Sequence, residues 1–247
     1  MYVERVRAVF PDFHNQIEEL VGEDARVAAR LTYTGSHRGE IWGFPATNEK
    51  IQYGGMAIFE CSAEKILRGY VLGDVEGLKE QLATARFKIV GERLSTPDIA
   101  IRPASNADKV WAAALMARSE PWITLSRTEE AARAVVRSPS HFVVVAVGPQ
   151  KENCAFILLH PEGVAGSPYI RSLAVAERFR SAGIGKRLLH FAECVFAGGS
   201  RHIFLCVSSF NHRARSLYER CGYTVVGELQ NYVIPGASEL LMHKDLS

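Results

Sequence analysis

The sequence has few cysteines, and their arrangement excludes two kinds of stabilised small domain. They are odd in number, no pair has C-x-x-C spacing, and they stand at Cys61, Cys154, Cys194, Cys206 and Cys221. A disulfide framework needs an even set of cysteines, and a structural zinc site usually needs closely paired ones. We therefore expect neither disulfides nor a metal site, and we expect a reducing, cytoplasmic location.

Long apolar runs are also lacking, and so is an excess of charge of either sign. No run approaches the roughly 20 apolar residues that a membrane-spanning helix needs, and the charged first residues do not resemble a secretory signal. The 29 Lys and Arg residues nearly balance the 27 Asp and Glu residues, and they are scattered along the chain. Neither a membrane nor a nucleic acid is therefore expected as a partner.

The most informative stretch is residues 170–189, which read IRSLAVAERFRSAGIGKRLL. An apolar run with strand character ends near Val175, a basic turn follows, and a helical pattern begins after Gly183 and Gly185. Backbone N–H groups at a helix N-terminus have no partner within the helix, and together with the helix dipole they favour an anion. Glycines let the backbone approach such a ligand closely. The stretch predicts a phosphate or pyrophosphate site.

Two familiar phosphate loops do not match this stretch. A Walker A loop requires Ser or Thr after its lysine, but Lys186 is followed by Arg187. A dinucleotide-binding fingerprint requires a third glycine or alanine where this chain has Leu188. Neither an ATPase nor a Rossmann dehydrogenase is therefore indicated.

Arg180, Gly183 and Gly185 instead resemble the R-x-x-G-x-G pyrophosphate loop of the GNAT acyltransferase superfamily. Residues 211–223, NHRARSLYERCGY, resemble the downstream signature of that superfamily, in which an Asn-capped helix carries a tyrosine and is closed by glycine and an aromatic residue. The resemblance covers about residues 98–247. It implies a mixed-sheet, three-layer α/β domain that binds acetyl-CoA and transfers its acetyl group to an amine.

The resemblance also implies roles for particular residues. The cofactor would contact Leu173, Ala174, Val175, Arg180, Ser181, Ala182, Gly183, Ile184, Gly185, Lys186 and Asn211. Tyr218 would be the general acid that protonates the departing thiolate. Two alternatives stay open, because Tyr218 also lies on an apolar helical stripe and Asn211 is also suited to cap a helix.

The acceptor side carries less specific signals. Glu120, Glu162 and His160 are candidate bases in loops or at strand ends where the family's acceptor pockets form, and of these we select Glu120 as catalytic and acceptor-binding. A surface role or a water chain is the alternative for each. Trp122 is a candidate wall of the acceptor pocket or an anchor for its loop. Cys206 has no histidine at a recognisable spacing, so it is interpreted as a core residue. The acceptor would be a small-molecule or peptide amine.

The first third of the chain has a different pattern. A short helix at residues 4–10 precedes strands at 27–33, 51–60 and 66–72, which predict an antiparallel meander followed by a closing helix. Residues 32–47 (TYTGSHRGEIWGFPAT) and 70–82 (YVLGDVEGLKEQL) resemble SnoaL-like polyketide cyclases, which have a cone-shaped α+β fold. That family begins with two helices and a strand that have no counterpart after Met1. We therefore expect a shortened cone with an open pocket that packs on the second domain or forms a homodimer.

In such cyclases an acidic residue at the position of Asp74 serves as acid/base catalyst, so Asp74 is the residue that the resemblance singles out. Its alternative role is the N-cap of the helix that begins at Val75.

These patterns predict a two-domain protein, α+β followed by α/β. Residues 1–85 would form the shortened SnoaL-like domain, 86–97 an irregular linker, and 98–247 the GNAT domain. In the GNAT domain, strands are expected at residues 99–102, 142–147, 154–159, 170–175, 203–207, 223–228 and 240–244. Ser105 with Asp108 and Ser126 with Glu129 predict capping boxes at the first two helices.

The function that these features favour is N-acetyl transfer from acetyl-CoA to a primary amine by direct attack. Two alternatives remain from the sequence alone. One is a non-catalytic sensor that binds an acyl-CoA, and the other is a cyclase or isomerase that acts at Asp74.

Overall fold

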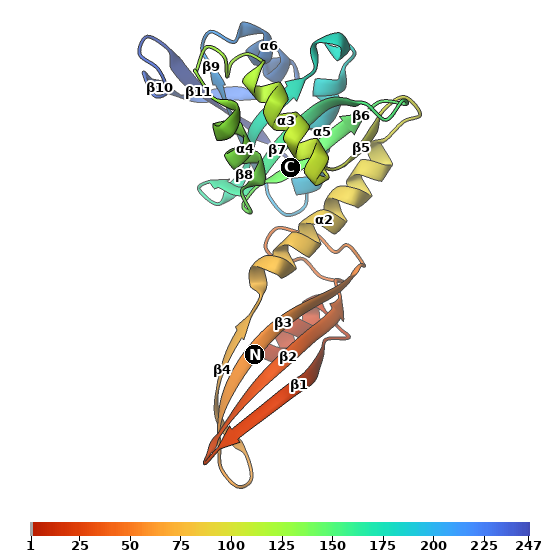
Figure 1. Ribbon diagram of the computed structural model, residues 1–247, viewed down its shortest axis with the longest axis vertical. Helices are drawn as coiled ribbons and strands as arrows, with labels where there is room; N and C mark the ends of the chain where they lie inside the picture. Colours follow the sequence, from red (N-terminus) through yellow and green to blue (C-terminus); the bar gives the residue numbers. More distant parts are fainter. Residues whose placement is uncertain (1) are drawn as a thin grey trace. The chain divides into compact units, whose positions relative to one another are not determined.

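The computed structural model describes residues 2–247 and contains two compact units (Figure 1). The first unit ends at Arg86, and the second runs from Phe87 to Ser247. The helix α2 (Val75–Leu94) crosses this boundary without a break. In the described part of the chain, no helix combines the length and the apolar character needed to cross a membrane.

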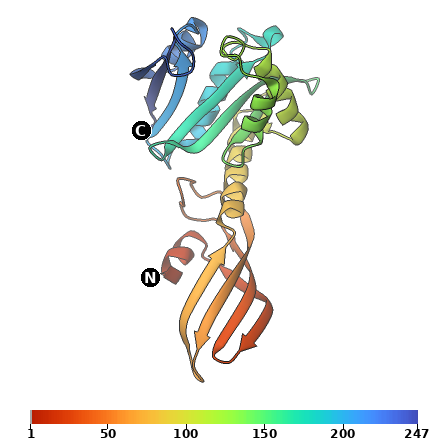
Figure 2. The same cartoon turned by 60° about the vertical axis from the view of Figure 1, so that its left-hand side comes forward.

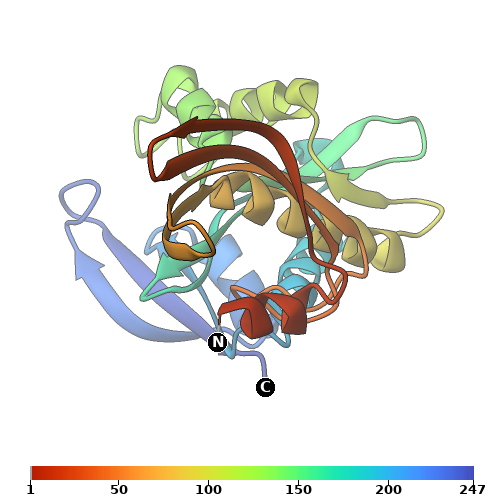
Figure 3. The same cartoon turned by 90° about the horizontal axis from the view of Figure 1, so that it is seen from below.

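The first unit is a helix followed by a four-stranded sheet. After α1 (Tyr2–Val9) come β1 (His14–Glu23), β2 (Arg26–Ser36), β3 (Lys50–Cys61) and β4 (Ile66–Gly73), each antiparallel to the next. The sheet is strongly curved, as its view along the strands shows (Figure 3). The meander predicted for β2, β3 and β4 is confirmed. The strand β1 was not predicted, because all ten of its residues are exposed and no apolar alternation marks them.

One face of this sheet holds the core of the first unit. Ala29, Leu31, Tyr33 and Ala57 are buried there, and Phe13, Tyr53 and Phe59 pack against them. At the end of β2, the Asp12 carboxylate accepts hydrogen bonds from the Ser36 backbone N–H at 2.6 Å and the Ser36 hydroxyl at 2.7 Å. These bonds lower the pKa of Asp12.

The second unit is built on a seven-stranded sheet in the order β10-β11-β9-β8-β7-β6-β5. The strands are β5 (Ala100–Pro103), β6 (Phe142–Val147), β7 (Asn153–Val164), β8 (Ser167–Val175), β9 (His202–Ser208), β10 (Thr224–Gln230) and β11 (Ser238–Asp245). All neighbouring strands are antiparallel except β8 and β9, which are parallel. Each of the seven corresponds to a strand that the sequence predicted.

Helices cover this sheet. They are α3 (Asn106–Ala117), α4 (Glu129–Arg137), α5 (Ile184–Phe196) and α6 (His212–Arg220), with a short 3-10 helix at Glu177–Phe179. Buried residues of α3 and α4 form one apolar cluster with side chains of β6, β7 and β8. The helix α5 contacts β7 and β8 and covers the other face of the sheet (Figure 1). The mixed-sheet α/β prediction is thus confirmed.

Two of the helix starts follow the sequence signals and one does not. Ser105 and Asp108 form the predicted reciprocal capping box at α3, and Asn211 caps α6 through a 3.2 Å bond from the Ala214 N–H. The prediction of Ser126 as the cap of α4 is wrong, because Thr128 takes that position and accepts from the Ala131 N–H at 3.1 Å. Thr128 is directly adjacent to the first residue of α4, whereas Ser126 has a positive φ of 53°.

The irregular linker expected at residues 86–97 is largely helical, because α2 continues to Leu94. Packing against the second unit stabilises a helix at residues 87–94, although the sequence there has no sustained helical period. Phe87 and Val90 are each 1% exposed, and the Phe87 ring lies 5.1 Å from the Phe142 ring, centroid to centroid. Gly91 lies where the Ile101 carbonyl leaves no room for a Cβ atom. The second unit therefore incorporates the last turns of α2.

A buried carboxylate joins three elements of the second unit. Asp108, which is 5% exposed, accepts hydrogen bonds from Arg102 at 2.7 Å, Asn153 at 2.9 Å and the Ser105 hydroxyl at 2.7 Å. Burial acts to raise the pKa of Asp108, but these hydrogen bonds outweigh it and hold the pKa well below its usual value.

We predict that Asp108→Ala lowers the free energy of unfolding by roughly 2 to 3 kcal/mol, because Arg102, Asn153 and Ser105 then lose the buried carboxylate that accepts their hydrogen bonds. Since the folded pKa is depressed, the stability that Asp108 contributes is present above a pH of about 4 and is lost as the pH falls further. Urea unfolding at pH 7 and at pH 3 measures both effects. The control, Glu129→Ala, removes an exposed pair with Arg133 and should cost under about 0.5 kcal/mol. An equal cost for both variants would contradict the prediction.

Candidate functional site

The second unit contains an open pocket of about 1390 Å³. Its walls come from the end of α3, the loop before α4, β8, the start of α5, β9, α6 and β11. The predicted site residues that line it are Glu120, Trp122, Leu173, Ala174, Val175, Arg180, Ser181, Gly183, Ile184, Gly185, Lys186, Asn211 and Tyr218, and the candidate base His160 joins them. Ala182 and Glu162 are not among the lining residues. Segments that are far apart in sequence thus meet at one cavity.

The pocket forms where the sheet opens between its two parallel strands. The strands β8 and β9 pair only at Tyr169 with Phe204 and at Ile170 with Leu205. Beyond Ile170 they separate, and the blue strands β9–β11 stand apart from the green and teal strands over much of their length (Figure 2). The edge of β8 from residue 171 to residue 175 consequently has no strand partner on this side, and its backbone is available to an extended ligand.

The loop between β8 and α5 is shaped to hold an anion. Ser181 and Gly183 have positive φ values of 70° and 75°, and the Arg180 guanidinium Nε donates to the Val175 carbonyl at 3.3 Å. Among the described residues, none accepts a hydrogen bond from the backbone N–H groups of Ser181, Ala182 and Gly183. These donors precede the positive end of the dipole of α5, so the loop can bind a phosphate group.

Gly185 has a packing role in addition to any role at the ligand. A Cβ atom there would lie 3.3 Å from Leu217 Cδ2, 3.6 Å from Val175 Cγ2 and 3.7 Å from Leu173 Cδ2. The absence of a side chain lets the first turn of α5 lie close to both β8 and α6. Gly183 differs, because a Cβ atom there would meet nothing within 4 Å.

Basic side chains surround the loop end of the pocket. Arg180, Lys186, Arg213 and Arg220 line it, and Arg213 donates to the Ser181 hydroxyl at 3.3 Å. The positive charges of Lys186 and Arg220 both act to lower the pKa of the nearby Cys221 thiol, although burial, the larger influence, raises it. This end of the pocket therefore favours a ligand with several negative charges.

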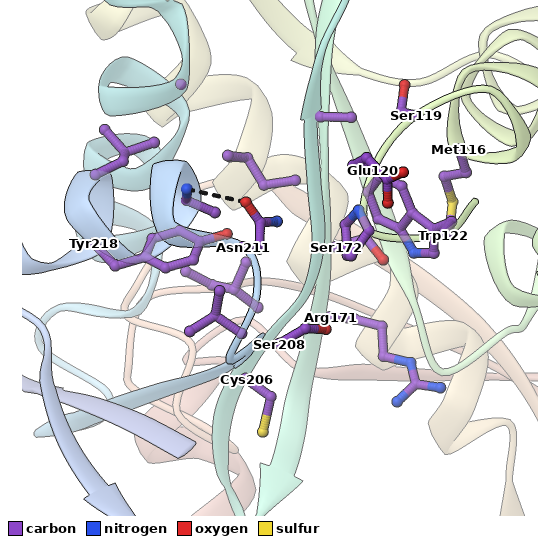
Figure 4. Close-up of a pocket in the computed structure, with 18 of the residues that line it drawn as sticks. Met116, Ser119, Glu120, Trp122, Arg171, Ser172, Cys206, Ser208, Asn211 and Tyr218 are labelled. Carbon is purple, nitrogen blue, oxygen red and sulfur yellow. Dashed lines mark hydrogen bonds between the residues drawn. The ribbon is translucent and has the colours of Figure 1, made fainter. Parts of the chain in front are cut away.

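Tyr218 is both a core residue and a residue of the pocket wall. Its side chain is 7% exposed, and burial, together with the nearby Cys221, raises the pKa of its hydroxyl to about 12. Figure 4 shows the hydroxyl directed toward Asn211, at the side of the pocket opposite Glu120 and Trp122. At neutral pH the hydroxyl holds its proton, so it can act as a proton donor.

The acceptor side combines polar and apolar groups on the loop before α4. Glu120 Oε2 accepts a hydrogen bond from the Thr124 N–H at 3.3 Å, and Trp122 packs against the apolar cluster of α3 and α4.

The strand β7 contributes His160 to the pocket. His160 Nδ1 accepts a hydrogen bond from the Glu162 N–H at 3.2 Å. A backbone N–H can only donate, so Nδ1 of His160 carries no proton and a neutral ring is protonated at Nε2.

Several polar residues of the pocket were not predicted, and His141, Tyr169, Arg171 and Glu239 are among them. His141 Nδ1 lies 2.9 Å from the Val135 carbonyl, which only accepts, so Nδ1 is protonated and Nε2 is the free acceptor of a neutral ring. Burial is the main cause that lowers the pKa of His141. Tyr169 and Arg171 alternate with buried residues along β8, which is the signal that would have placed them on the pocket face.

The first unit has a small groove by comparison. It measures about 450 Å³ and is lined by residues that include Arg30, Gly54 and Asp74. The Asp74 carboxylate accepts from the Gly77 N–H at 2.9 Å, and its carbonyl accepts from the Leu78 N–H. Asp74 therefore acts as a cap at the start of α2, as its alternative interpretation predicted.

A mixed sheet that opens between its parallel strands, with an anion loop and a helix at the opening, defines an acyltransferase-like class of fold. Residues 107–223 match the model of the acetyltransferase (GNAT) family, and residues 1–82 match that of the SnoaL-like polyketide cyclases. The chain therefore contains a SnoaL-like domain followed by a GNAT acetyltransferase domain.

Solved structures agree with this assignment of the fold. A GNAT-family acetyltransferase of Desulfovibrio desulfuricans, described as putative, has a TM-score of 0.52 at 18% identity, and the match covers 60% of this chain and 99% of that chain. An aminoglycoside 6'-N-acetyltransferase complexed with coenzyme A has a TM-score of 0.51 at 21% identity, covering 60% of this chain and 97% of that chain. At these identities the likeness establishes the fold. No curated protein matches this sequence.

Proposed function

We propose that this protein is an acetyl-CoA-dependent N-acetyltransferase that acts on a primary amine by direct attack. The observation that carries the proposal is the common pocket: the anion loop before α5, the unpaired edge of β8 and the Tyr218 hydroxyl all line it. A GNAT domain and a pocket with this combination of groups support acyl transfer as the activity.

The residues of the pocket fit coenzyme A as a ligand. The N–H groups of residues 181–183, the first turn of α5 and the basic side chains Arg180 and Lys186 would hold its phosphates. The free edge of β8 from Leu173 to Val175 would pair with its amide groups, as an added strand pairs with a sheet. Asn211, which caps α6, lines the same wall. Acetyl-CoA, when bound, supplies an acetyl group activated as a thioester.

Tyr218 is proposed as the general acid. Its hydroxyl retains the proton because burial raises its pKa to about 12, and it faces the pocket. Donation of this proton to a leaving sulfur is a modest aid, roughly ten- to a thousandfold in rate, because a thiolate is already a fair leaving group.

Glu120 is proposed as the base that accepts the proton of the amine. Of the three sequence candidates, Glu162 does not line the pocket, and His160 has its Nδ1 already engaged by the Glu162 N–H. The Glu120 carboxylate lines the pocket beside Trp122, which would form the wall against which the acceptor packs.

Calorimetric titration of acetyl-CoA into the full chain tests the cofactor, with NAD and ATP as controls. We expect acetyl-CoA to bind with a dissociation constant of about 1–100 μM, within the range usual for enzyme substrates, and NAD to give no heat of binding. Release of free thiol in the presence of an amine panel then tests turnover. Binding without turnover on any amine would favour the acyl-CoA sensor, and absence of binding would overturn the transferase assignment.

A further inference from the structure

The pocket contains an arginine on β8, Arg171, that the cofactor loop does not explain. Arg171 lines the pocket and is the one exposed residue of β8. Its side chain makes no hydrogen bond or ion pair with any residue in the described range 2–247. The register of β7 and β8 shifts at this point, since Leu158 pairs with Ser172 and Leu159 with Ile170, so that Arg171 has no partner on β7. Such bulges redirect side chains next to functional sites.

Arg171 is too far from the anion loop to serve the same phosphates. Residues along a strand are spaced by about 3.3 Å, so Arg171 lies roughly 13 Å from Val175, where the loop begins. The loop end also has its own basic residues, Arg180, Lys186, Arg213 and Arg220. In Figure 4 the guanidinium of Arg171 extends away from Tyr218 and Asn211.

Arg171 and Glu239, which have opposite charges, both lie near Tyr169 and Cys206 but do not pair with each other. Burial is the main cause that raises the pKa of Tyr169 and of Cys206, and on both of them the charges of Glu239 and Arg171 act in opposite directions. Arg171 and Glu239 therefore lie near the same phenol and thiol, yet no ion pair joins them within residues 2–247. Glu239 accepts instead from the Ser208 hydroxyl at 2.5 Å.

A second donor lies near the arginine. His160 is the cross-strand partner of Tyr169, whose side chain lies on the same face of β8 as that of Arg171. Because Nδ1 of His160 accepts from a backbone N–H, a neutral ring presents its Nε2–H as a donor. The ring of His141 is 5.3 Å from that of His160, and it too lines the pocket.

We propose that Arg171 binds a carboxylate of the acceptor, so that the substrate class is an amine that also carries a carboxylate, as amino acids do. The amino group of this substrate class rests on the proposed function, whereas its carboxylate rests on the position of Arg171 in the pocket. A guanidinium binds a carboxylate through two parallel N–H···O bonds, a geometry that lysine does not reproduce. The pocket carboxylates Glu120 and Glu239 would face the positive amino group.

Matched pairs of amines test the proposal. L-Phenylalanine is compared with 2-phenylethylamine, and L-lysine with cadaverine, because each pair differs by the carboxylate. Calorimetry or saturation-transfer NMR measures their binding to the full chain, both with and without saturating coenzyme A. We expect at least one amino acid to bind about 10- to 100-fold more tightly than its decarboxylated partner, the range usual for a charge-assisted pair. In Arg171→Met this ratio should fall to about one, whereas Arg171→Lys should retain only part of it.

The matched control is Arg201→Met, which removes the same charge from an exposed residue outside the pocket and should leave the ratio unchanged. Equal binding of both members of every pair, or no binding of either amino acid, would overturn the proposal. So would a ratio that Arg171→Met leaves intact. Failure of the proposed function is distinguishable, because it would appear as absence of acetyl-CoA binding, whereas the carboxylate site is also measured without any cofactor.

Discussion

Tyr218→Phe is expected to reduce kcat by roughly ten- to a thousandfold while the affinity for acetyl-CoA changes by less than about twofold. The substitution removes the proton donor and retains the ring that packs in α6. The hydroxyl makes no hydrogen bond with any of the described residues, so the free energy of unfolding should change by less than about 1 kcal/mol. Steady-state rates of thiol release and calorimetry measure the two quantities separately.

The nearby Tyr223 offers a matched control. Its ring lies 6.2 Å from that of Tyr218, it is 1% exposed, and it does not line the pocket. Tyr223→Phe should therefore leave kcat within about twofold of the parent value, because its hydroxyl cannot reach a bound ligand. If both variants lose rate and stability together, Tyr218 is a core residue and the general-acid assignment is wrong.

The pH dependence sharpens this test. Because burial raises the pKa of Tyr218 to about 12, the hydroxyl is protonated throughout the usual assay range. The ratio of parent to Tyr218→Phe rates should therefore be constant between about pH 6 and 9. A ratio that changes within this range would contradict the expectation that the Tyr218 hydroxyl keeps its proton throughout it.

Local patterns predicted the elements that have a clear apolar run, an apolar alternation or a capping signal in their own sequence. Several strands of the second unit have an apolar run or an apolar alternation, and the capping box at Ser105 is a signal of four residues. Both kinds of signal can be recognised without knowledge of the tertiary structure. The anion loop was predicted for the same reason, because Arg180, Gly183 and Gly185 are close in sequence. In each case the residues that determine the local structure lie within a few positions of it in the sequence.

The elements that were missed depend on contacts far apart in sequence. The extension of α2 past Arg86 depends on Phe87 meeting Phe142, Phe191 and Phe196. In the pocket, Glu239 comes beside Ser208 only because β11 pairs with β9, and Arg171 faces the cavity only because β8 and β9 separate after Ile170. No periodicity in the sequence encodes that separation.

Gly183→Ala is expected to weaken acetyl-CoA binding by about 10- to 100-fold, the loss expected when one or two hydrogen bonds to a charged group are displaced. Gly183 has a φ of 75° and precedes the first turn of α5. An alanine in this left-handed conformation costs roughly 1 kcal/mol, and any relaxation of the strain rotates the N–H groups away from the ligand. Calorimetric titration at constant ionic strength measures the affinity, and urea unfolding measures the strain.

The chain provides a close control for the strain itself. Gly166 has a φ of 77° and, like Gly183, would place a Cβ atom where nothing lies within 4 Å, but it stands in the turn between β7 and β8 outside the pocket. Gly166→Ala should therefore lose the same stability, about 1 kcal/mol, with no change in acetyl-CoA affinity. Equal loss of affinity in both variants would mean that global destabilisation explains the effect. The two substitutions have the same backbone cost and differ in whether the glycine lines the pocket. A loss of acetyl-CoA affinity in Gly183→Ala alone would therefore assign ligand binding to the loop.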